Sequence, residues 1–561
     1  MPFAHRTGLS SAYTGVMAGR SINQAGGAVL EHSEGPSESP WSSGELPRKV
    51  HLLGIGGAGV SGAARLLHAQ GRRCTGHDRA PGAFLKDLQA LGLAVEVGES
   101  CAEALPADAE LVVRSAAVPE SDPQVEAALE RGIPVLTYAQ LLGKLTHPSC
   151  LLAVAGTHGK TTTSWLLHHA LRGLTEVFER SPLFAGDAER ALGAWPGALI
   201  GGRCRLLETN AVASEPQGWF ALEACEFERS FLELEPHAAG ITNIEADHLD
   251  CYGSLGALVE AFGDFAARVS PRGLLVVGAD VPASVEARAR CRTWRLGREV
   301  LTQKVVCDEQ GARFELTVPG LEGLPVHTPL MGRFNVENAA VALSLALGGT
   351  GALSSVDEPR SARLGERLLR HERGGVSEPV DPPARRWLGE RAAGSLARFP
   401  GAGRRFEPWG EVAGVELIHD YAHHPTEVAA TLAAARQRFG HRPLHVLFQP
   451  HQHERTGRFL DAFVEALSSA DRVVLTPVYG ARSADGEGPS AEASELAAGL
   501  QQRGVPVDVA EDLDACGELF VRDLKARTIG MVLGAGTIDS IRHDLLATLA
   551  LRSRAAGQSE R

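Results

Sequence analysis

The sequence lacks the features of a disulfide-rich, zinc-binding or membrane-spanning protein. It has nine cysteines, an odd number, and none of them forms a Cys-x-x-Cys pair. This pattern indicates reduced thiols and not a disulfide framework or a zinc site. No apolar run approaches the roughly 18 residues that cross a bilayer, so we expect no membrane span. The N-terminus has no apolar signal-peptide core either, and we expect a cytoplasmic protein.

The sequence also has fewer positively charged residues than negatively charged ones. The chain has 55 lysines and arginines against 68 aspartates and glutamates, which gives a net charge of −13. Binding to a phosphate backbone needs a basic surface, so we expect no nucleic-acid partner. Anionic small molecules are not excluded, because a few local positive groups are enough to bind them.

The 561 residues predict roughly three or four domains. Short apolar runs alternate with helix-like runs, which predicts α/β domains with doubly wound parallel sheets. Ligands of such sheets bind at the carboxyl ends of the strands. The predicted parts are a disordered tail rich in Gly, Ser, Ala and Pro (1–47), three α/β domains (48–148, 149–348 and 403–561), and a linker or insertion (349–402). The predicted strands are 50–53, 111–113, 135–136, 151–154, 218–223, 239–243, 274–277, 415–418, 444–448, 472–475 and 529–533.

A glycine loop follows the predicted strand 151–154 and opens a helix. It contains Gly156, Thr157, His158, Gly159, Lys160, Thr161 and Thr162. Glycines let backbone N–H groups approach phosphates, a lysine adds a point charge, and a threonine hydroxyl can hold Mg²⁺. The loop is shorter than G-x-x-x-x-G-K-[ST], because the first glycine of that pattern would fall on Val154. We predict a site for a nucleoside triphosphate.

A second glycine loop, Gly54-Ile55-Gly56-Gly57-Ala58-Gly59, follows the predicted strand 50–53. It matches G-x-G-x-x-G, and Asp78 follows Gly59 at a distance of 19 residues. Taken literally, the pattern is that of an NAD site. Its physical content is broader, because any diphosphate can rest on a helix N-terminus. A tight turn without a ligand is the remaining interpretation.

Polar residues follow other predicted strands. Glu223 and His248 are each more typical of loop hydrogen bonding when taken alone, but beside a phosphate loop they become candidate metal ligands. Mg²⁺ usually prefers oxygen ligands, so the histidine is the less expected of the two. Four nearby carboxylates are rivals for which we expect exposure to solvent: Glu226, Glu228, Glu245 and Asp247.

The last predicted domain has its own candidates. Asp420 ends a strand, which suits a ribose hydroxyl or a metal. The neighbouring histidines 423 and 424 need not converge on a metal. Arg455 can receive a carboxylate or be an ordinary loop arginine. In the central domain, helix capping is the simplest role of Asn335, whereas Asn338 lies one turn further along.

Several motifs in series resemble the Mur ligases, and within them the branch that adds L-alanine. The motifs occur in that family's order and span about residues 50–540. They are residues 51–59, 156–163, 242–250, 404–406, 420–427 and 448–451. The resemblance implies a Rossmann-like UDP-sugar-binding domain, a central P-loop-type ATPase domain and a Rossmann-like C-terminal domain. It also implies an ATP- and Mg²⁺-dependent ligase that joins L-alanine to the lactyl carboxylate of UDP-N-acetylmuramate through an acyl phosphate. We expect a monomer or homodimer.

The resemblance assigns a role to each candidate residue. It implies catalytic roles for Lys160, His248 and Arg405, and metal binding by Thr161, Glu223 and His248. ATP would contact the loop residues 156–162, Asn338, Arg405 and Asp420. The UDP-sugar diphosphate and the substrate carboxylates would contact Gly54, Gly56, Gly57, Ala58, Gly59, Asp78, Ser115, His424, His451 and Arg455.

The chain also departs from the family pattern. Cys225 replaces an acidic residue, Phe334 a histidine, and Gln452 an arginine, while Tyr138 stands where an arginine is expected. These changes leave open a ligase for another amino acid or a peptide, and a catalytically silent nucleotide-binding relative. An NAD-dependent oxidoreductase would leave the Lys160 loop unexplained.

Overall fold

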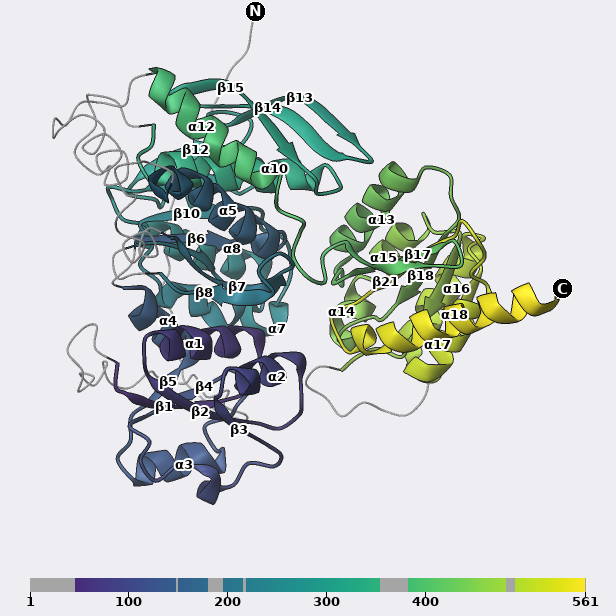
Figure 1. Cartoon of the computed structure of the whole chain (residues 1–561), viewed down its shortest axis with the longest axis horizontal. Coiled ribbons are helices and arrows are strands. Elements are labelled where there is room, and N and C mark those ends of the chain that lie inside the picture. The colour runs from purple at the N-terminus through teal and green to yellow at the C-terminus, as the bar shows by residue number, and fades with distance from the viewer. Residues whose placement is uncertain are drawn as a thin grey trace, which may run out of the picture. The chain divides into compact units, whose positions relative to one another are not determined.

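The computed structural model describes residues 46–147, 150–179, 195–214, 218–353, 382–480 and 490–559. Among these residues the strands form four sheets, three of them mainly parallel with helices on both faces and one small and antiparallel (Figure 1). Every strand that the sequence predicted is present, with ends shifted by one or two residues at most.

The first sheet has five parallel strands in the order β3-β2-β1-β4-β5. Successive residues of a strand point to opposite faces. Leu52 therefore packs beneath α1 and α4, whereas the next residue, Leu53, packs against α3. The strands are β1 (Lys49–Leu53), β2 (Arg73–Asp78), β3 (Ala94–Val97), β4 (Leu111–Arg114) and β5 (Val135–Thr137); the helices are α1 (Ala58–Ala69), α2 (Ala83–Ala90), the 3₁₀ helix η1 (Ala102–Ala104), α3 (Pro123–Glu130) and α4 (Tyr138–Thr146).

The central sheet has seven strands in the order β12-β11-β10-β6-β9-β7-β8, and only the edge strand β8 is antiparallel to its neighbour. Leu152 and Val154 of β6 pack with α5 and α10, and Leu151 and Ala153 pack with α8 on the other face. The strands are β6 (Cys150–Ala155), β7 (Gly197–Cys204), β8 (Thr209–Val212), β9 (Trp219–Glu223), β10 (Ala238–Ile241), β11 (Leu274–Val277) and β12 (Arg292–Arg295). The helices are α5 (Lys160–Glu179), η3 (Phe227–Glu233), α7 (Leu249–Tyr252), α8 (Leu255–Arg268), α9 (Ala283–Glu286), α10 (Phe334–Ser344) and η4 (Leu345–Gly349).

A small antiparallel sheet extends the central domain and was not expected from the sequence. Its strands are β13 (Leu301–Asp308), β14 (Gly311–Val318) and β15 (Leu321–Thr328). In β14 the apolar residues Ala312, Phe314, Leu316 and Val318 are buried and alternate with more exposed ones. That period of two was a readable strand signal.

Helix α12 (Pro382–Leu396) lies in the segment for which the sequence predicted a linker or insertion. Its residues Leu388, Ala392 and Leu396 are buried in the same core as α5 and the small sheet. The end of this segment therefore belongs to the central core. Residues 354–381 of that segment lie outside the described residues, as do 1–45 of the predicted tail and 180–194.

The C-terminal sheet has the order β16-β17-β21-β18-β19-β20, with only β16 antiparallel. Helices α13, α15 and α16 cover one face, and α17 and α18 cover the other (Figure 1). The strands are β16 (Glu407–Val412), β17 (Val415–Asp420), β18 (Leu444–Phe448), β19 (Arg472–Leu475), β20 (Val507–Val509) and β21 (Ile529–Leu533). The helices are α13 (Pro425–Phe439), α14 (His453–Arg458), α15 (Leu460–Leu467), α16 (Ala491–Gln502), α17 (Leu513–Arg522), η5 (Ile538–Ile541) and α18 (Arg542–Ser559).

Two predicted absences agree with the structure. None of the nine cysteines forms a disulfide, as expected from their number and spacing. Of the helices that the structure describes, none combines the length and apolar character needed to cross a bilayer.

Candidate active site

The loop between β6 and α5 has the backbone of a phosphate cradle. Gly156 has a φ of 131° and Gly159 a φ of 81°, values that side chains other than glycine rarely adopt. A Cβ atom on Gly159 would lie 2.5 Å from Oδ1 of Asn338, and one on Gly156 would lie 2.1 Å from Oγ1 of Thr242. Both glycines are therefore required by conformation and by close neighbours, which fits a loop shaped to let backbone N–H groups face an anion.

Lys160 folds back across this loop. Its Nζ donates to the carbonyl oxygens of Gly156 (2.6 Å) and Thr157 (3.0 Å) and lies 3.0 Å from the carboxylate of Glu226. Burial alone would lower the pKa of Lys160, but the Glu226 carboxylate outweighs it and raises the pKa. The lysine therefore stays charged in the position that a phosphate group would otherwise approach.

Thr161 and Glu223 form an oxygen-rich pair at the start of α5. Both carboxylate oxygens of Glu223 lie 3.0 Å from the Thr161 hydroxyl, and Oε2 also accepts from the backbone N–H of Gly201 at 2.7 Å. A hydroxyl and a carboxylate are ligands that suit Mg²⁺. The oxygen donors of this pair therefore fit Mg²⁺. His248 has a left-handed conformation (φ 51°) with its ring 5.4 Å from Phe227; burial lowers its pKa, and the charges of Asp247, Glu226 and Lys160 act on it.

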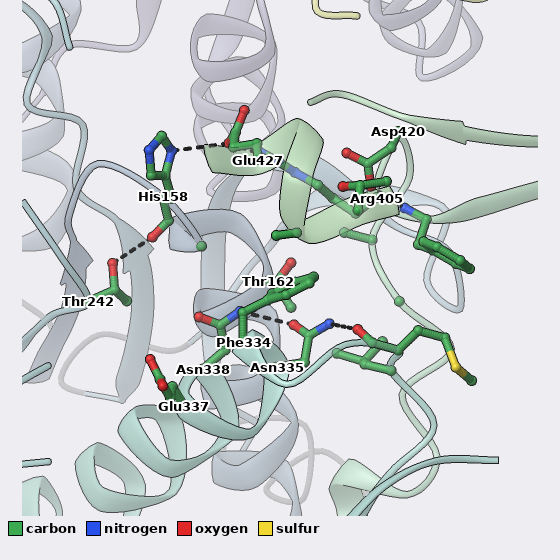
Figure 2. A pocket seen from close by; sticks show the side chains of 18 of the residues that line it. His158, Thr162, Thr242, Phe334, Asn335, Glu337, Asn338, Arg405, Asp420 and Glu427 are labelled. Atoms are coloured by element: carbon green, nitrogen blue, oxygen red, sulfur yellow. Dashed lines mark hydrogen bonds and ion pairs between the residues drawn. The ribbon is translucent and has the colours of Figure 1, made fainter. Parts of the chain in front are cut away.

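A cavity of about 310 Å³ opens beside the loop, and both the central and C-terminal domains line it (Figure 2). Asn338 donates to Asn335 at 2.9 Å, and Asn335 donates to the Met331 carbonyl at 2.6 Å. Asn335 is thus a positioning residue for Asn338 and not a helix cap, which corrects the simplest sequence interpretation. Phe334, 38% exposed, adds an apolar ring to the wall of the cavity.

Two C-terminal residues predicted to contact ATP, Arg405 and Asp420, also line this cavity. The Asp420 carboxylate accepts from the backbone N–H groups of Phe406 (2.7 Å) and Ala422 (2.8 Å), and burial raises its pKa to about 6. Arg405 lies 3.4 Å from Glu427, and Glu427 in turn lies 3.3 Å from Nδ1 of His158. Arg405 and Glu427 thus bring opposite charges to the mouth of the phosphate loop.

Arg455 is held by a carboxylate of the central domain. Its guanidinium donates to Asp247 at 2.6 Å, and both side chains are at least nine-tenths buried. Burial alone would raise the pKa of Asp247, but Arg455 outweighs it and holds the pKa well below the usual range. His451 lies 3.2 Å from the same guanidinium. This arginine is therefore already matched to a carboxylate, the group that we expected it to bind.

The N-terminal glycine loop is a tight turn with close packing. Gly56 N–H donates to the Asp78 carboxylate at 2.7 Å. A Cβ on Gly54 would lie 2.7 Å from Cβ of Ser115, and one on Gly59 would lie 2.7 Å from the ring of Tyr138. The N-cap of α1, Gly57, makes no side-chain capping bond. The structure thus gathers the predicted residues of this loop, and Asp78 bonds to the loop itself.

A second cavity, of about 220 Å³, lies beside the N-terminal glycine loop and reaches Glu223. Gly59 and Tyr138 line one side, and Glu223 and Cys225 line the other. Burial raises the pKa of the Tyr138 hydroxyl, which stays a neutral hydrogen-bond donor. Glu223 therefore lies between this cavity and Thr161.

Some site residues were missed by the sequence analysis. Glu226 and Asp247, expected to face solvent, are 2% and 8% exposed and pair with Lys160 and Arg455. That expectation was wrong because each carboxylate has a cationic partner far away in sequence. Glu427 was not singled out, although its position three residues into α13 marks a helix-start acid.

Comparison with known proteins gives a consistent result over most of the chain. Models of the Mur ligase family, catalytic domain, of the Mur ligase middle domain and of the Mur ligase, glutamate ligase domain match residues 49–149, 154–346 and 404–536. The UDP-N-acetylmuramate–L-alanine ligase of Acidithiobacillus ferrooxidans is 35% identical, covering 88% of this chain and 96% of the relative. That of Rubrobacter xylanophilus is 34% identical, covering 89% and 100%.

Solved structures agree on the fold. The UDP-N-acetylmuramate–alanine ligase of Thermotoga maritima superposes with a TM-score of 0.66 at 23% identity, covering 91% of this chain and all of that one. A murein peptide ligase from Psychrobacter arcticus gives 0.59 at 22% identity, covering 90% and 99%. With all three domain models matched in order and relatives similar over nearly their full length, the chain belongs to the Mur ligase family.

Proposed function

We propose that this protein is an ATP-dependent ligase that joins L-alanine to the lactyl carboxylate of UDP-N-acetylmuramate. The relatives that share 34–35% of its sequence carry this activity in their names. The observation that carries the proposal is the position of Glu223, which lines the cavity that reaches the N-terminal loop and accepts a hydrogen bond from Thr161 of the phosphate loop. A phosphoryl donor and a carboxylate acceptor can meet there.

The larger cavity suits ATP. Asn338 offers an amide to a base edge, and the exposed ring of Phe334 offers a face on which a base can stack. Lys160 and Arg405 would balance the charge of the phosphates, and Lys160 must leave the carbonyl groups of its own loop to do so. Asp420 accepts two backbone hydrogen bonds and so fixes the turn at Phe406. We propose that it also accepts a hydrogen bond from a ribose hydroxyl of ATP.

The smaller cavity suits the carboxylate acceptor. The N-terminus of α1, with no side-chain cap, can receive a diphosphate from Gly54 to Gly59, with Asp78 and Ser115 at its sides. The lactyl group of the bound sugar would then extend toward Tyr138 and Glu223. Tyr138 would donate a hydrogen bond where the family pattern has a charge.

The carboxylate of the amino acid would bind Arg455, beside His451 and His424. Asp247 occupies this guanidinium and would have to give way, so the amino acid replaces one carboxylate by another. Gln452 has a φ of 67° next to this site and replaces an arginine of the family pattern. This observation favours, as a second candidate, an acceptor amino acid other than L-alanine or a peptide.

The chemistry follows from the donor and the acceptor. A carboxylate oxygen attacks the terminal phosphorus of ATP, which breaks the bond to ADP and gives an acyl phosphate. The free amine of the amino acid then attacks the acyl carbon, loses a proton and expels phosphate. Mg²⁺ held by Thr161, Glu223 and His248 would neutralise charge on the phosphate oxygens. Closure of the C-terminal domain, which carries Arg405, would exclude water from the acyl phosphate.

The test is phosphate release from ATP and Mg²⁺ in the presence of UDP-N-acetylmuramate and a panel of single amino acids and short peptides. We expect release with L-alanine and little release without an acceptor. Release with a different amino acid alone would favour the second candidate, and no release with any acceptor would refute a ligase. Sedimentation of the purified chain would decide whether it is a monomer or a homodimer, the two states that we expect. Fractionation of cells would test the proposed cytoplasmic location.

A further inference from the structure

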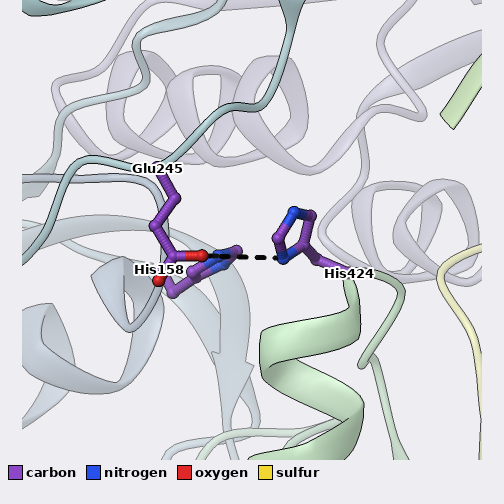
Figure 3. Close-up of side chains that lie close together, drawn as sticks. All are labelled: His158, Glu245 and His424. Atoms are coloured by element: carbon purple, nitrogen blue, oxygen red, sulfur yellow. Dashed lines mark ion pairs between the residues drawn. The ribbon is translucent and has the colours of Figure 1, made fainter. Parts of the chain in front are cut away.

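Three side chains of metal-ligating types converge where the central and C-terminal domains meet (Figure 3). His158 belongs to the phosphate loop, Glu245 follows β10, and His424 caps α13. One ligand atom from each lies within 4.8 Å of the other two. This set differs from Thr161, Glu223 and His248.

Between the three side chains the spacing suits a metal ion better than direct hydrogen bonds, while Oε2 of Glu245 also accepts from the Thr426 hydroxyl at 2.7 Å. Oε2 of Glu245 lies 3.5 Å from Nε2 of His158 and 3.8 Å from Nδ1 of His424. Both distances exceed those of good N–H···O hydrogen bonds. Around tetrahedral Zn²⁺, with bonds of about 2.0–2.2 Å, neighbouring ligand atoms lie roughly 3.3–3.6 Å apart. Small rotations of these side chains would close the set around such an ion.

The hydrogen-bond partners and protonation of the His158 and His424 rings also suit metal binding. Nε2 of His158 is buried without a hydrogen-bond partner, while Nδ1 of the same ring faces Glu427 at 3.3 Å. A carboxylate behind a ligating histidine is the usual outer partner of a zinc-bound imidazole. Burial and the neighbouring His158 lower the pKa of His424 to about 4, so its ring is neutral at pH 7. A metal would replace the proton that Glu245 and Glu427 favour on His158, whose pKa they raise to about 9 against the effect of burial.

We propose that His158, Glu245 and His424 form a site for one divalent cation of the Zn²⁺ class, with Glu427 as its outer carboxylate. Two imidazoles and one carboxylate suit Zn²⁺, Co²⁺ or Ni²⁺ and disfavour Mg²⁺, which binds mainly oxygen. The bound ion joins the phosphate loop to the first residue before α13, and so fixes the C-terminal domain against the central one. The site goes beyond the proposed function and depends on no step of it.

Co²⁺ is the probe, titrated into the full chain, free of any affinity tag, without nucleotide or UDP-sugar. We expect one equivalent to bind with the visible absorption of a four-coordinate nitrogen and oxygen site, and a large excess of Mg²⁺ to leave it in place. A thiolate-to-cobalt band would place the ion on cysteine and overturn the proposal, as would full displacement by Mg²⁺.

Variants then assign the ligands. His424→Gln and Glu245→Gln should each weaken Co²⁺ binding by about 10–100-fold. His453→Gln is the matched control, because His453 is a half-exposed histidine of the C-terminal domain that pairs with Glu492 at 3.0 Å. It should bind Co²⁺ like the parent. Circular dichroism must show both ligand variants folded, and Glu245→Gln, at the more exposed position, keeps the test valid if His424→Gln does not fold. Parent affinity in a folded ligand variant would overturn the proposal.

Discussion

Two glycine loops connect a buried strand to the following helix, one in the N-terminal domain and one in the central domain. They differ in the side chains that surround them. Each follows a buried strand and opens a helix, α1 in one case and α5 in the other. In the first, Gly56 N–H is bonded to Asp78, and no lysine is present. In the second, Lys160 and Thr161 meet Glu226 and Glu223. The shared backbone shape suits phosphate binding, and the cation with its carboxylates adds the means to transfer a phosphoryl group.

The largest effect should come from the cation that only the second loop has. We expect Lys160→Ala to lower phosphate release by about 10³-fold or more, because it removes the charge that balances the transferring phosphoryl group. Lys86→Ala, at an exposed site of α2 near the first loop, is the control and should keep the parent rate. A Lys160 variant with near-parent turnover would show that the two loops do not differ as proposed.

The backbone of the two loops can be compared by adding one methyl group. Gly159→Ala puts a Cβ at a φ of 81° and 2.5 Å from Asn338, and we expect a cost of about 1–3 kcal/mol together with weaker ATP binding. In Gly57→Ala the added Cβ meets only the Gly54 carbonyl, at 3.4 Å, and the φ of −67° suits any residue. This substitution should lower the free energy of unfolding far less. Thermal unfolding and ATP calorimetry measure both. Equal losses in the two variants would contradict the comparison.

Acid should affect the first sheet through His51 on β1. Burial lowers the pKa of His51 from 6.5 to about 4, so the unfolded chain takes up a proton that the folded chain rejects. The neutral His51 ring therefore contributes its full share to the free energy of unfolding above pH 6.5, and this share is lost as the pH falls toward 4. We expect His51→Gln to remove roughly 3 kcal/mol of the stability change over that range, since each pKa unit corresponds to about 1.4 kcal/mol. Urea unfolding at several pH values measures this, and parallel curves for parent and variant would rule it out.

The smallest effect should come from the carboxylate inside the first loop. Asp78→Asn keeps the shape but weakens the 2.7 Å hydrogen bond from Gly56 N–H, at a cost of about 1 kcal/mol. ATP binding should be unchanged, which ATP calorimetry can check. A drop in ATP affinity as large as that of Gly159→Ala would show that the first loop serves ATP.

The sequence predicted eleven of the described strands, both glycine loops and the family, because these depend on local patterns. Apolar runs such as 151–154 and the glycines after them are read directly from neighbouring residues. The small sheet β13–β15 also had a local signal, the alternation from Ala312 to Val318, and could have been found.

The partners of the charged residues could not be predicted in that way. Asp247 and Arg455 are 208 residues apart, and Lys160 and Glu226 are 66 apart. Only the folded sheets bring such pairs together, so burial of these carboxylates was not readable from their polar neighbours. The same holds for Glu427, whose contact with His158 depends on the meeting of two domains.

Oxygen transfer tests the central claim most directly. UDP-N-acetylmuramate with ¹⁸O in its lactyl carboxylate is incubated with ATP, Mg²⁺, L-alanine and the protein, and the released phosphate is analysed by mass spectrometry. If the second loop delivers the phosphoryl group to the carboxylate, the phosphate carries an ¹⁸O atom from that carboxylate. Phosphate without the label would mean that water is the acceptor, and would contradict the account.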